Sequence, residues 1–308
     1  MSFTWYELND AYPIAITSIT RKTLYFYPFI VNEKETDDLK ESFKDKPKDL
    51  KELTNFLCKP ILLKHVTITK EDGEFIPLPT FVQGRSVFNI ISSSGSGKSV
   101  LLSKILKEFQ RIKKNDNFEY FLLTNKENEP AFKDLKDLKK LPVYNLEKPI
   151  TNLEKFRKSV WILDDILEGI DMSNSEFLKE LDKQPISFTK KRKIQKEKEF
   201  QVQSIVEKST EAFLTLGRSY EINLFLVKHE FRDGRKNLWK MEATHSIFFP
   251  SNNKSRINDY LKTTEGLTKQ EIERVMNLEN SKTTYQFLLL SRIGLRYCIS
   301  NRDAIAID

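Results

Sequence analysis

Short apolar runs alternate with charged segments along most of the chain, and this alternation predicts an α/β fold. The first such run, at 87–91, is β-prone and bounded by small residues, so it predicts a buried strand. Residues 101–112 then place apolar side chains at three- and four-residue steps, which predicts one face of an amphipathic helix. Similar runs predict buried strands at 120–124, 160–163, 222–227 and 245–250. Together they indicate a mostly parallel sheet flanked by helices.

The first 84 residues do not continue this pattern. Residues 24–31 predict an edge strand, since Pro28 excludes the segment from the centre of a sheet. Residues 35–57 are highly charged and offer only weak helical periodicity, broken at Pro47. This region is either a docking region for a partner or neighbouring subunit, or a small accessory layer packed on the core. Prolines and Gly84 mark its end, so we expect an N-terminal accessory region at 1–84 and a main domain at 85–308.

The C-terminal part of the chain carries two clear local signals. Thr268 and Glu271 have the spacing of a capping box that opens a short helix. Residues 286–290 and 295–299, around Gly294, predict a closing hairpin.

The loop after the first strand has the residue types of a P-loop. It reads Ser-Ser-Ser-Gly-Ser-Gly-Lys-Ser over residues 92–99, between the predicted strand and its helix. Glycines let the backbone N–H groups wrap around phosphate oxygens, and the helix points its positive end at the same phosphates. Lys98 would reach the β- and γ-phosphates, and the Ser99 hydroxyl would bind Mg²⁺. The residues expected to contact the nucleotide are Ser94, Gly95, Ser96, Gly97, Lys98, Ser99 and Val100.

One position departs from the usual P-loop pattern. The motif opens with glycine, and Ser92 occupies that place. Serine is small enough to fit but adopts positive φ less readily, so the loop matches a relaxed form of the motif. The alternative is a serine-rich loop that caps an ordinary helix. The strand before the loop and the helix after it favour the P-loop.

An acidic pair follows the strand predicted at 160–163. Asp164 and Asp165 close this apolar run, which is the Walker B arrangement. Asp164 would hold Mg²⁺, and Asp165 would orient and polarise the water that attacks the γ-phosphate. The alternative is a strand that ends in two turn-forming aspartates. With a P-loop upstream we favour the catalytic interpretation, and expect the acids one strand away from the lysine.

A basic window lies within a helical region between 171 and 216. Its basic residues are Lys190, Lys191, Arg192, Lys193, Lys196 and Lys198, with Glu197 and Glu199 among them. They could line a DNA channel and neutralise phosphates without reading sequence. They could equally form a solvated helix face, since no aromatic residues interleave with them as stacking platforms would require.

Two further positions are candidates because of where they fall. Gly217 predicts a helix C-cap, and Arg218 after it is a candidate arginine finger for a neighbouring subunit, as are Arg232 and Arg235. His229 follows the strand at 222–227, at the carboxyl edge where active groups of parallel sheets gather. There it could sense the γ-phosphate or position water, or it could be an ordinary polar residue.

Composition narrows the class without identifying it. The chain has 308 residues, 39% hydrophobic and 31% charged, which is typical of a globular protein. Its net charge of +7 is compatible with a polyanionic partner. Cys58 and Cys298 are far apart, so neither a disulfide framework nor a zinc site is expected, and a reducing compartment fits better. No apolar run is long enough to predict a membrane span.

These residues together resemble the FtsK–HerA superfamily of P-loop motor ATPases, and within it the genome-packaging ATPases of large DNA viruses and virophages. The resemblance covers about residues 84–303. It depends on the loop at 94–99, on Ile162 to Asp165, on Gly217-Arg218, on the strand ending at His229, and on 244–250. The helix after Leu267-Thr268 and the pair Ser291-Arg292 add to it.

The resemblance implies a RecA-like P-loop core with an N-terminal extension, ATP and Mg²⁺ as cofactors, and a homo-oligomeric ring of five or six copies. It implies Lys98 on phosphate, Ser99 and Asp164 on Mg²⁺, Asp165 as the water-activating carboxylate, and a finger role for Arg218. His229 stands where cellular relatives more often have glutamine, and Asp165 where many motors have glutamate. Relatives move double-stranded DNA through a central channel, so the implied partners are duplex DNA and capsid vertex proteins.

The resulting prediction is a viral DNA translocase that packages a genome, in the virion or in a virus factory of the host cytoplasm. Two alternatives stay open. A small-molecule P-loop kinase would need a phosphoryl-acceptor pocket, and the Asp164-Asp165 pair argues against it. A non-hydrolysing, nucleotide-gated assembly protein stays open because serine takes the place of the first P-loop glycine at position 92.

Overall fold

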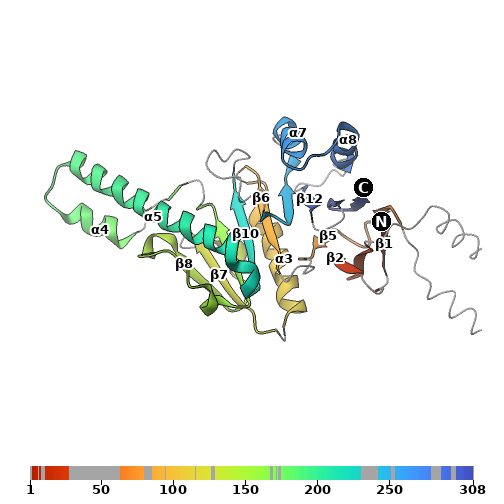
Figure 1. Cartoon of the computed structure of the whole chain (residues 1–308), viewed down its shortest axis with the longest axis horizontal. Coiled ribbons are helices and arrows are strands. Elements are labelled where there is room, and N and C mark those ends of the chain that lie inside the picture. Colours follow the sequence, from red (N-terminus) through yellow and green to blue (C-terminus); the bar gives the residue numbers. More distant parts are fainter. Residues whose placement is uncertain are drawn as a thin grey trace, which may run out of the picture. The chain divides into compact units, whose positions relative to one another are not determined.

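The computed structural model describes fifteen stretches of the chain (Figure 1). They are residues 2–5, 7, 11–27, 63–79, 85–93, 95–114, 116–125, 129–166, 169–170, 172, 175–229, 242–250, 254–278, 286–292 and 296–307. The periodicity expected at 35–57 and the candidates Ser94, Arg232 and Arg235 lie outside them. In the described part no helix has the length and apolar character needed to cross a membrane. The chain divides into two compact units, Phe81–Gly266 and a unit made of Met1–Thr80 with Leu267–Asp308.

The unit Phe81–Gly266 is built on parallel strands flanked by helices, the α/β class expected from the sequence. Its strands are β6 (Val87–Ile91), β7 (Glu119–Thr124), β8 (Leu138–Pro142), β9 (Ser159–Asp164), β10 (Ile222–Lys228) and β11 (His245–Phe248). They lie in the order β11-β6-β10-β9-β7-β8, and each neighbouring pair is parallel. The predicted strands at 87–91, 120–124, 160–163, 222–227 and 245–250 are therefore confirmed.

Two features of this sheet differ from the prediction. Strand β8 comes from a segment with no strand pattern; it is the last strand on its side, and its residues are only partly buried or exposed. Strand β10 lies between β6 and β9, so the acids are two strands from the lysine rather than one. Strand order depends on which distant segments pair, and local periodicity does not encode it.

The register of β10 aligns the carboxyl ends of three strands. Lys228 of β10 pairs with Ile91, the last residue of β6, and Val227 pairs with Asp164, the last residue of β9. Because the strands are parallel, the residues that follow them meet at one edge of the sheet.

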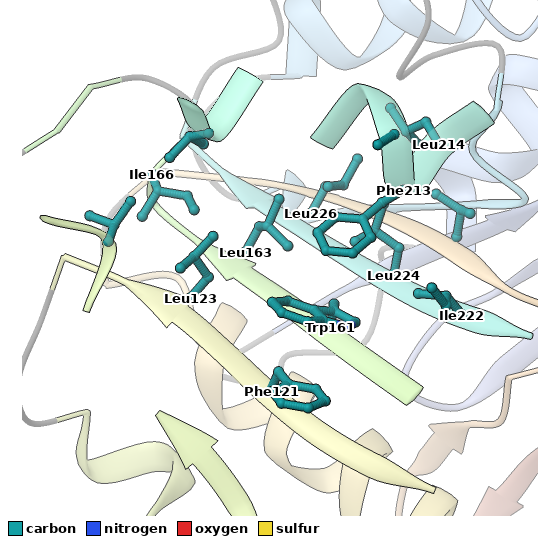
Figure 2. Packing of buried hydrophobic residues seen from close by; sticks show 14 of the residues in the cluster. Phe121, Leu123, Trp161, Leu163, Ile166, Phe213, Leu214, Ile222, Leu224 and Leu226 are labelled. Carbon is teal, nitrogen blue, oxygen red and sulfur yellow. The ribbon is translucent and has the colours of Figure 1, made fainter. Parts of the chain in front are cut away.

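The described part of this unit contains four α-helices. They are α3 (Lys98–Ile112), α4 (Glu176–Lys183), α5 (Phe188–Leu216) and α7 (Lys254–Thr263), with 3₁₀ turns η1 (Pro130–Phe132), η2 (Val143–Asn145), η3 (Leu153–Phe156) and η4 (Gly217–Tyr220). Trp161 of β9 is fully buried, with its ring 4.5 Å from Phe121 of β7 and 4.6 Å from Phe213 of α5, centroid to centroid. Figure 2 shows this cluster continuing through Leu163 and Leu226. Each such side chain contributes about 1.5–3 kcal/mol by leaving water, so this packing fixes the C-terminal half of α5 on the sheet.

Helix α5 ends at Leu216 with Gly217 as its C-cap, as predicted. Gly217 has φ −59°, a right-handed value, so it is not a left-handed cap. A Cβ here would lie 2.8 Å from Nη1 of Arg85 and 3.4 Å from the Ile222 side chain. Glycine is therefore required for this close approach rather than for its backbone freedom.

The second unit is mostly antiparallel. Its strands are β1 (Ser2–Thr4), β2 (Tyr12–Thr17), β3 (Thr23–Tyr27), β4 (His65–Thr67), β5 (Phe75–Pro77), β12 (Leu288–Ser291), β13 (Tyr297–Ile299) and β14 (Asp303–Ala306), with helix α8 (Lys269–Asn277). One set pairs in the order β1-β3-β2-β5 and the other in the order β4-β14-β13-β12. The closing hairpin β12–β13 and the capping box at Thr268 and Glu271 are confirmed.

The N-terminal strands pair differently from the prediction. Strand β3 lies between β1 and β2, so the predicted edge position is wrong. The strand ends at Tyr27, and Pro28 lies outside the described residues. The segment from Leu267 onward lies in the same unit as the N-terminal strands, because β14 pairs with β4. The sequence had assigned it to the P-loop domain instead.

Candidate nucleotide-binding site

The loop between β6 and α3 has the backbone that a phosphate cradle needs. Gly95 has φ +75° and Gly97 has φ +95°, values that residues with a Cβ rarely adopt. Gly97 is the N-cap of α3, and Lys98 is the first helical residue. The two glycines thus occupy the positions at which the loop turns into the helix.

The N-terminus of α3 is suited to an anion. No side chain caps the helix, and its first turn contains no acidic residue. The Ser96 hydroxyl oxygen is buried and has no hydrogen-bond partner among the described residues. A helix of 15 residues directs its unpaired N–H groups and positive dipole end into this loop. These features fit a phosphate group, which would complete the cap.

Lys98 lies in the pocket with its charge enclosed. Its side chain is buried, and Nζ donates hydrogen bonds to the carbonyl oxygens of Ser92 at 2.8 Å and Ser93 at 3.1 Å. A third contact joins Nζ to Nδ1 of His229 at 3.1 Å. The ammonium group is therefore held by neutral acceptors that belong to the loop and to the end of β10.

His229 connects the lysine to the acidic pair. Its Nε2 lies 3.1 Å from Oδ1 of Asp165, while Nδ1 faces Lys98. Nδ1 also lies 3.2 Å from the carbonyl oxygen of Ser92, so it accepts from the Lys98 ammonium group when it is unprotonated and donates to Ser92 when it carries the ring proton. The order of the strands explains the bridge, since β10 brings His229 between the lysine from the β6–α3 loop and the acid from β9.

Asp165 is held in an unusual backbone conformation. Its φ is +56°, in the left-handed region, which costs an aspartate on the order of 1 kcal/mol. Its N–H donates to the carbonyl of Val227 at 3.2 Å, and its own carbonyl accepts from Nδ2 of Asn125 at 3.3 Å. Asn125 also donates to the carbonyl of Gly169 at 3.1 Å. These bonds fix the turn that aims the carboxylate toward His229.

Sequence reasoning missed Asn125. The residue directly follows β7, at the same sheet edge as His229 and the acidic pair. The available signal was a polar side chain after a predicted buried strand. The same rule had been applied to His229 but not to this position.

The other nucleotide and metal candidates lie around this cluster. Asp164 ends β9 and is buried, opposite Thr124 on one side and Val227 on the other. Ser99 lies in the first turn of α3. Val100 follows Ser99 in α3, and its side chain is 50% exposed.

Arg218 does not join this cluster. It lies in η4, before the amino end of β10, whereas His229 follows the carboxyl end. At about 3.3 Å per residue, the seven residues of β10 separate the two by roughly 20 Å. A role for Arg218 at a nucleotide bound to its own chain is excluded by this separation, and a role toward a neighbouring copy stays a prediction.

Comparison with known proteins adds several similar solved structures. No family model matches the chain, and no curated protein matches it. The genome-packaging NTPase B204 of Sulfolobus turreted icosahedral virus 2, with sulfate, is 14% identical at a TM-score of 0.40, covering 70% of this chain and 96% of that one. B204 of Sulfolobus turreted icosahedral virus, described as its DNA-packaging ATPase, is 16% identical at a TM-score of 0.41, covering 70% and 96%.

A third similar structure comes from conjugation. The pCW3 coupling protein TcpA, as a monomer with ATPγS, is 14% identical at a TM-score of 0.42, covering 97% of this chain and 77% of that one. Similarity at this level carries no residue roles, so the function is argued from the side chains of this chain.

Proposed function

We propose that this chain is an ATP-hydrolysing motor that moves double-stranded DNA and packages a viral genome. The observation that carries the enzymatic part is the connected set Lys98–His229–Asp165, placed where a glycine loop meets a helix N-terminus. A buried cation, a bridging imidazole and a carboxylate at this edge supply phosphate binding and water activation in one place.

ATP and Mg²⁺ are the cofactors that this site fits. The metal would neutralise charge on the β- and γ-phosphates, with the Ser99 hydroxyl and the Asp164 carboxylate as its protein ligands. Within the described ranges no group of three or more His, Cys, Asp or Glu side chains could hold a metal ion. Mg²⁺ is usually held by one or two carboxylates together with substrate phosphates and water.

Each side chain has a distinct task in this proposal. Lys98 exchanges its carbonyl partners for phosphate oxygens, a stronger charge-assisted interaction. Asp165 orients the attacking water and accepts its proton. His229 contacts both groups, so it reports to the acid whether the lysine is engaged by phosphate.

The DNA-handling part of the proposal has separate support. A net charge of +7 suits a polyanion, and the resemblance points to packaging motors. A ring of five or six copies would place Arg218, at the opposite end of β10, near the nucleotide of a neighbour. Capsid vertex proteins are the further partner, and the virion or the virus factory in the host cytoplasm is the expected location.

Phosphate release measured with and without linear duplex DNA tests this function. Wild-type protein should hydrolyse ATP faster when the duplex is present. Asp165→Asn should bind ATP normally and lose turnover by about 1000-fold, since general-base groups typically contribute 10²–10⁴-fold. If Asp165→Asn hydrolysed ATP at the wild-type rate, Asp165 would not be the catalytic base.

The same assay separates the alternatives. A small-molecule kinase would be indifferent to DNA and would need an acceptor for the phosphoryl group. A nucleotide-gated assembly protein would bind ATP and release no phosphate. Either outcome would contradict the motor.

A further inference from the structure

The N-terminal half of α5 is not part of the packed core. The buried residues of this 29-residue helix begin at Val202, and none of residues 188–201 is buried. At 1.5 Å per residue, this half extends about 21 Å. Figure 1 shows it, together with α4, standing away from the strands β6 to β10. We call residues 188–201 the basic arm.

The basic arm carries six of the chain's cations, and they divide into two groups. Lys191 donates to the carbonyl of Asp182 at 2.5 Å, and Lys198 lies over the ring of Phe177 at 5.9 Å, so both help to hold α4 against α5. The second group has no side-chain hydrogen bond or ion pair within the described part of the chain. It consists of Lys190, Arg192, Lys193 and Lys196, all of them exposed.

Helical spacing places this second group on one face. Lys193 and Lys196 are three residues apart, Arg192 and Lys196 four, so their side chains are neighbours on the helix surface. The buried positions Val202 and Ile205, continued back along the helix, lie on the opposite side. The cations therefore face away from the side of α5 that carries its buried residues.

We propose that this face of the basic arm binds the phosphate backbone of duplex DNA. The choice of DNA rests on the proposed function, and the choice of surface rests on charge. Six basic and two acidic residues occupy 190–199, and Glu199 accepts a hydrogen bond from Gln195. Unpaired cations on a rigid helix gain affinity by releasing the counterions that surround DNA.

The exposed aromatic residues argue for a duplex rather than a single strand. Phe188 is 78% exposed and Phe200 is 75% exposed, at the two ends of the arm. Twelve residues of helix separate them by about 18 Å. That spacing cannot stack successive bases of one strand, which requires aromatic residues interleaved with the cations.

A matched pair of triple variants tests the location. The arm variant is Arg192→Gln, Lys193→Gln and Lys196→Gln, and the control variant is Lys133→Gln, Lys136→Gln and Lys140→Gln. All six positions are exposed, and both variants remove three positive charges. Glutamine has a helix propensity close to that of lysine and arginine, so α5 should keep its helicity, which circular dichroism checks.

The measurement is anisotropy of a labelled duplex, titrated without nucleotide at several salt concentrations. Each lost phosphate contact should lower the slope of log K against log[salt] by about 0.9, so the arm variant should lose about 2.7 in slope and roughly 500-fold in affinity at 0.1 M salt. The control variant should keep the wild-type slope. The arm variant should bind ATP with wild-type affinity, so failure of the arm and failure of the nucleotide site are read separately.

Three outcomes would overturn the proposal. Equal losses in both triple variants would show that only net charge matters. Preference for a single strand, lost in Phe200→Ala, would make the arm a stacking surface. Wild-type duplex binding in the arm variant, with an altered native mass, would make this face a contact between copies of the chain.

Discussion

The two ends of the parallel sheet each enclose a cation, and they hold it in different ways. At the amino end Arg85, just before β6, is 2% exposed. At the carboxyl end Lys98, just after the same strand, is 6% exposed. Burial alone therefore does not distinguish a structural cation from a functional one, and their partners must be compared.

Arg85 is tied by a fixed fork of bonds. Its guanidinium donates to the carbonyls of Phe213 and Leu214 at 2.7 Å each, and to the Glu242 carboxylate at 3.0 Å. Burial lowers the pKa of Arg85, Glu242 raises it, and the nearby Arg218 lowers it further. The arginine satisfies carbonyls at the C-terminal end of α5, so it joins helix to sheet.

Lys98, in contrast, is held by exchangeable partners. Two loop carbonyls and one imidazole nitrogen are neutral acceptors, and phosphate oxygens can replace them at a gain. The comparison teaches that a buried cation with charged and bidentate partners supports the fold, whereas one with neutral partners in a positive-φ loop is available to a ligand.

The largest expected effect is the loss of ATP affinity when Lys98 is replaced. Lys98→Ala should weaken ATP binding by about 1000-fold, because removing one member of a close charge pair costs about 2–5 kcal/mol. Its free energy of unfolding should change by no more than about 1 kcal/mol. Calorimetric titration with an ATP analogue and urea denaturation measure the two quantities. Unchanged ATP affinity would count heavily against the site.

The second prediction concerns Arg85 at the amino end of the sheet, where stability should change and ATP affinity should not. Arg85→Ala should lower the free energy of unfolding by about 3 kcal/mol, because it leaves two helix carbonyls and a carboxylate without their donor. ATP affinity of the folded protein should stay near that of wild type. Arg85→Lys is the matched control, since it keeps the charge but cannot form the fork and should recover only part of the loss. A stability equal to wild type in Arg85→Ala would show that these bonds contribute nothing net.

The smallest effect concerns a second histidine of the same sheet. His245 of β11 is fully buried, stacked on Phe88 at 4.4 Å, and burial lowers its pKa to about 3. The unfolded chain binds a proton near pH 6.5 and the folded chain does not, so stability is complete above pH 6.5 and falls as the pH drops below it. The slope for one such group is about 1.4 kcal/mol per pH unit, or roughly 2 kcal/mol between pH 6.5 and 5.

Urea denaturation at pH 7 and pH 5 measures this difference. His245→Phe keeps a ring against Phe88 and removes the titrating group, so its stability should depend less on pH over that range. Equal pH dependence in wild type and His245→Phe would show that other groups dominate.

The sequence was informative where chemistry and periodicity are local. The strand at 87–91, the positive-φ glycines and the helix from Lys98 follow from a motif whose residue types are dictated by backbone geometry. The partly buried β8 was missed because its residues do not form a hydrophobic run. The bridge through His229 could not be predicted in detail, because it depends on β10 pairing with both β6 and β9, which are separated from it by dozens of residues. Asn125 and Arg85 went unnoticed for the same reason, since their partners are distant in sequence.

Because β10 lies between β6 and β9, its register with them determines how the site residues are placed. The backbone of β10 is bonded to both neighbours, so it sets the relative height of the lysine-bearing loop and the acid-bearing turn. Alternate residues of a strand face opposite sides, so a displacement of β10 by one residue would turn the imidazole away and sever both of its contacts together. In the proposed motor, the register of β10 would therefore set the distance between the lysine that binds phosphate and the carboxylate that orients water.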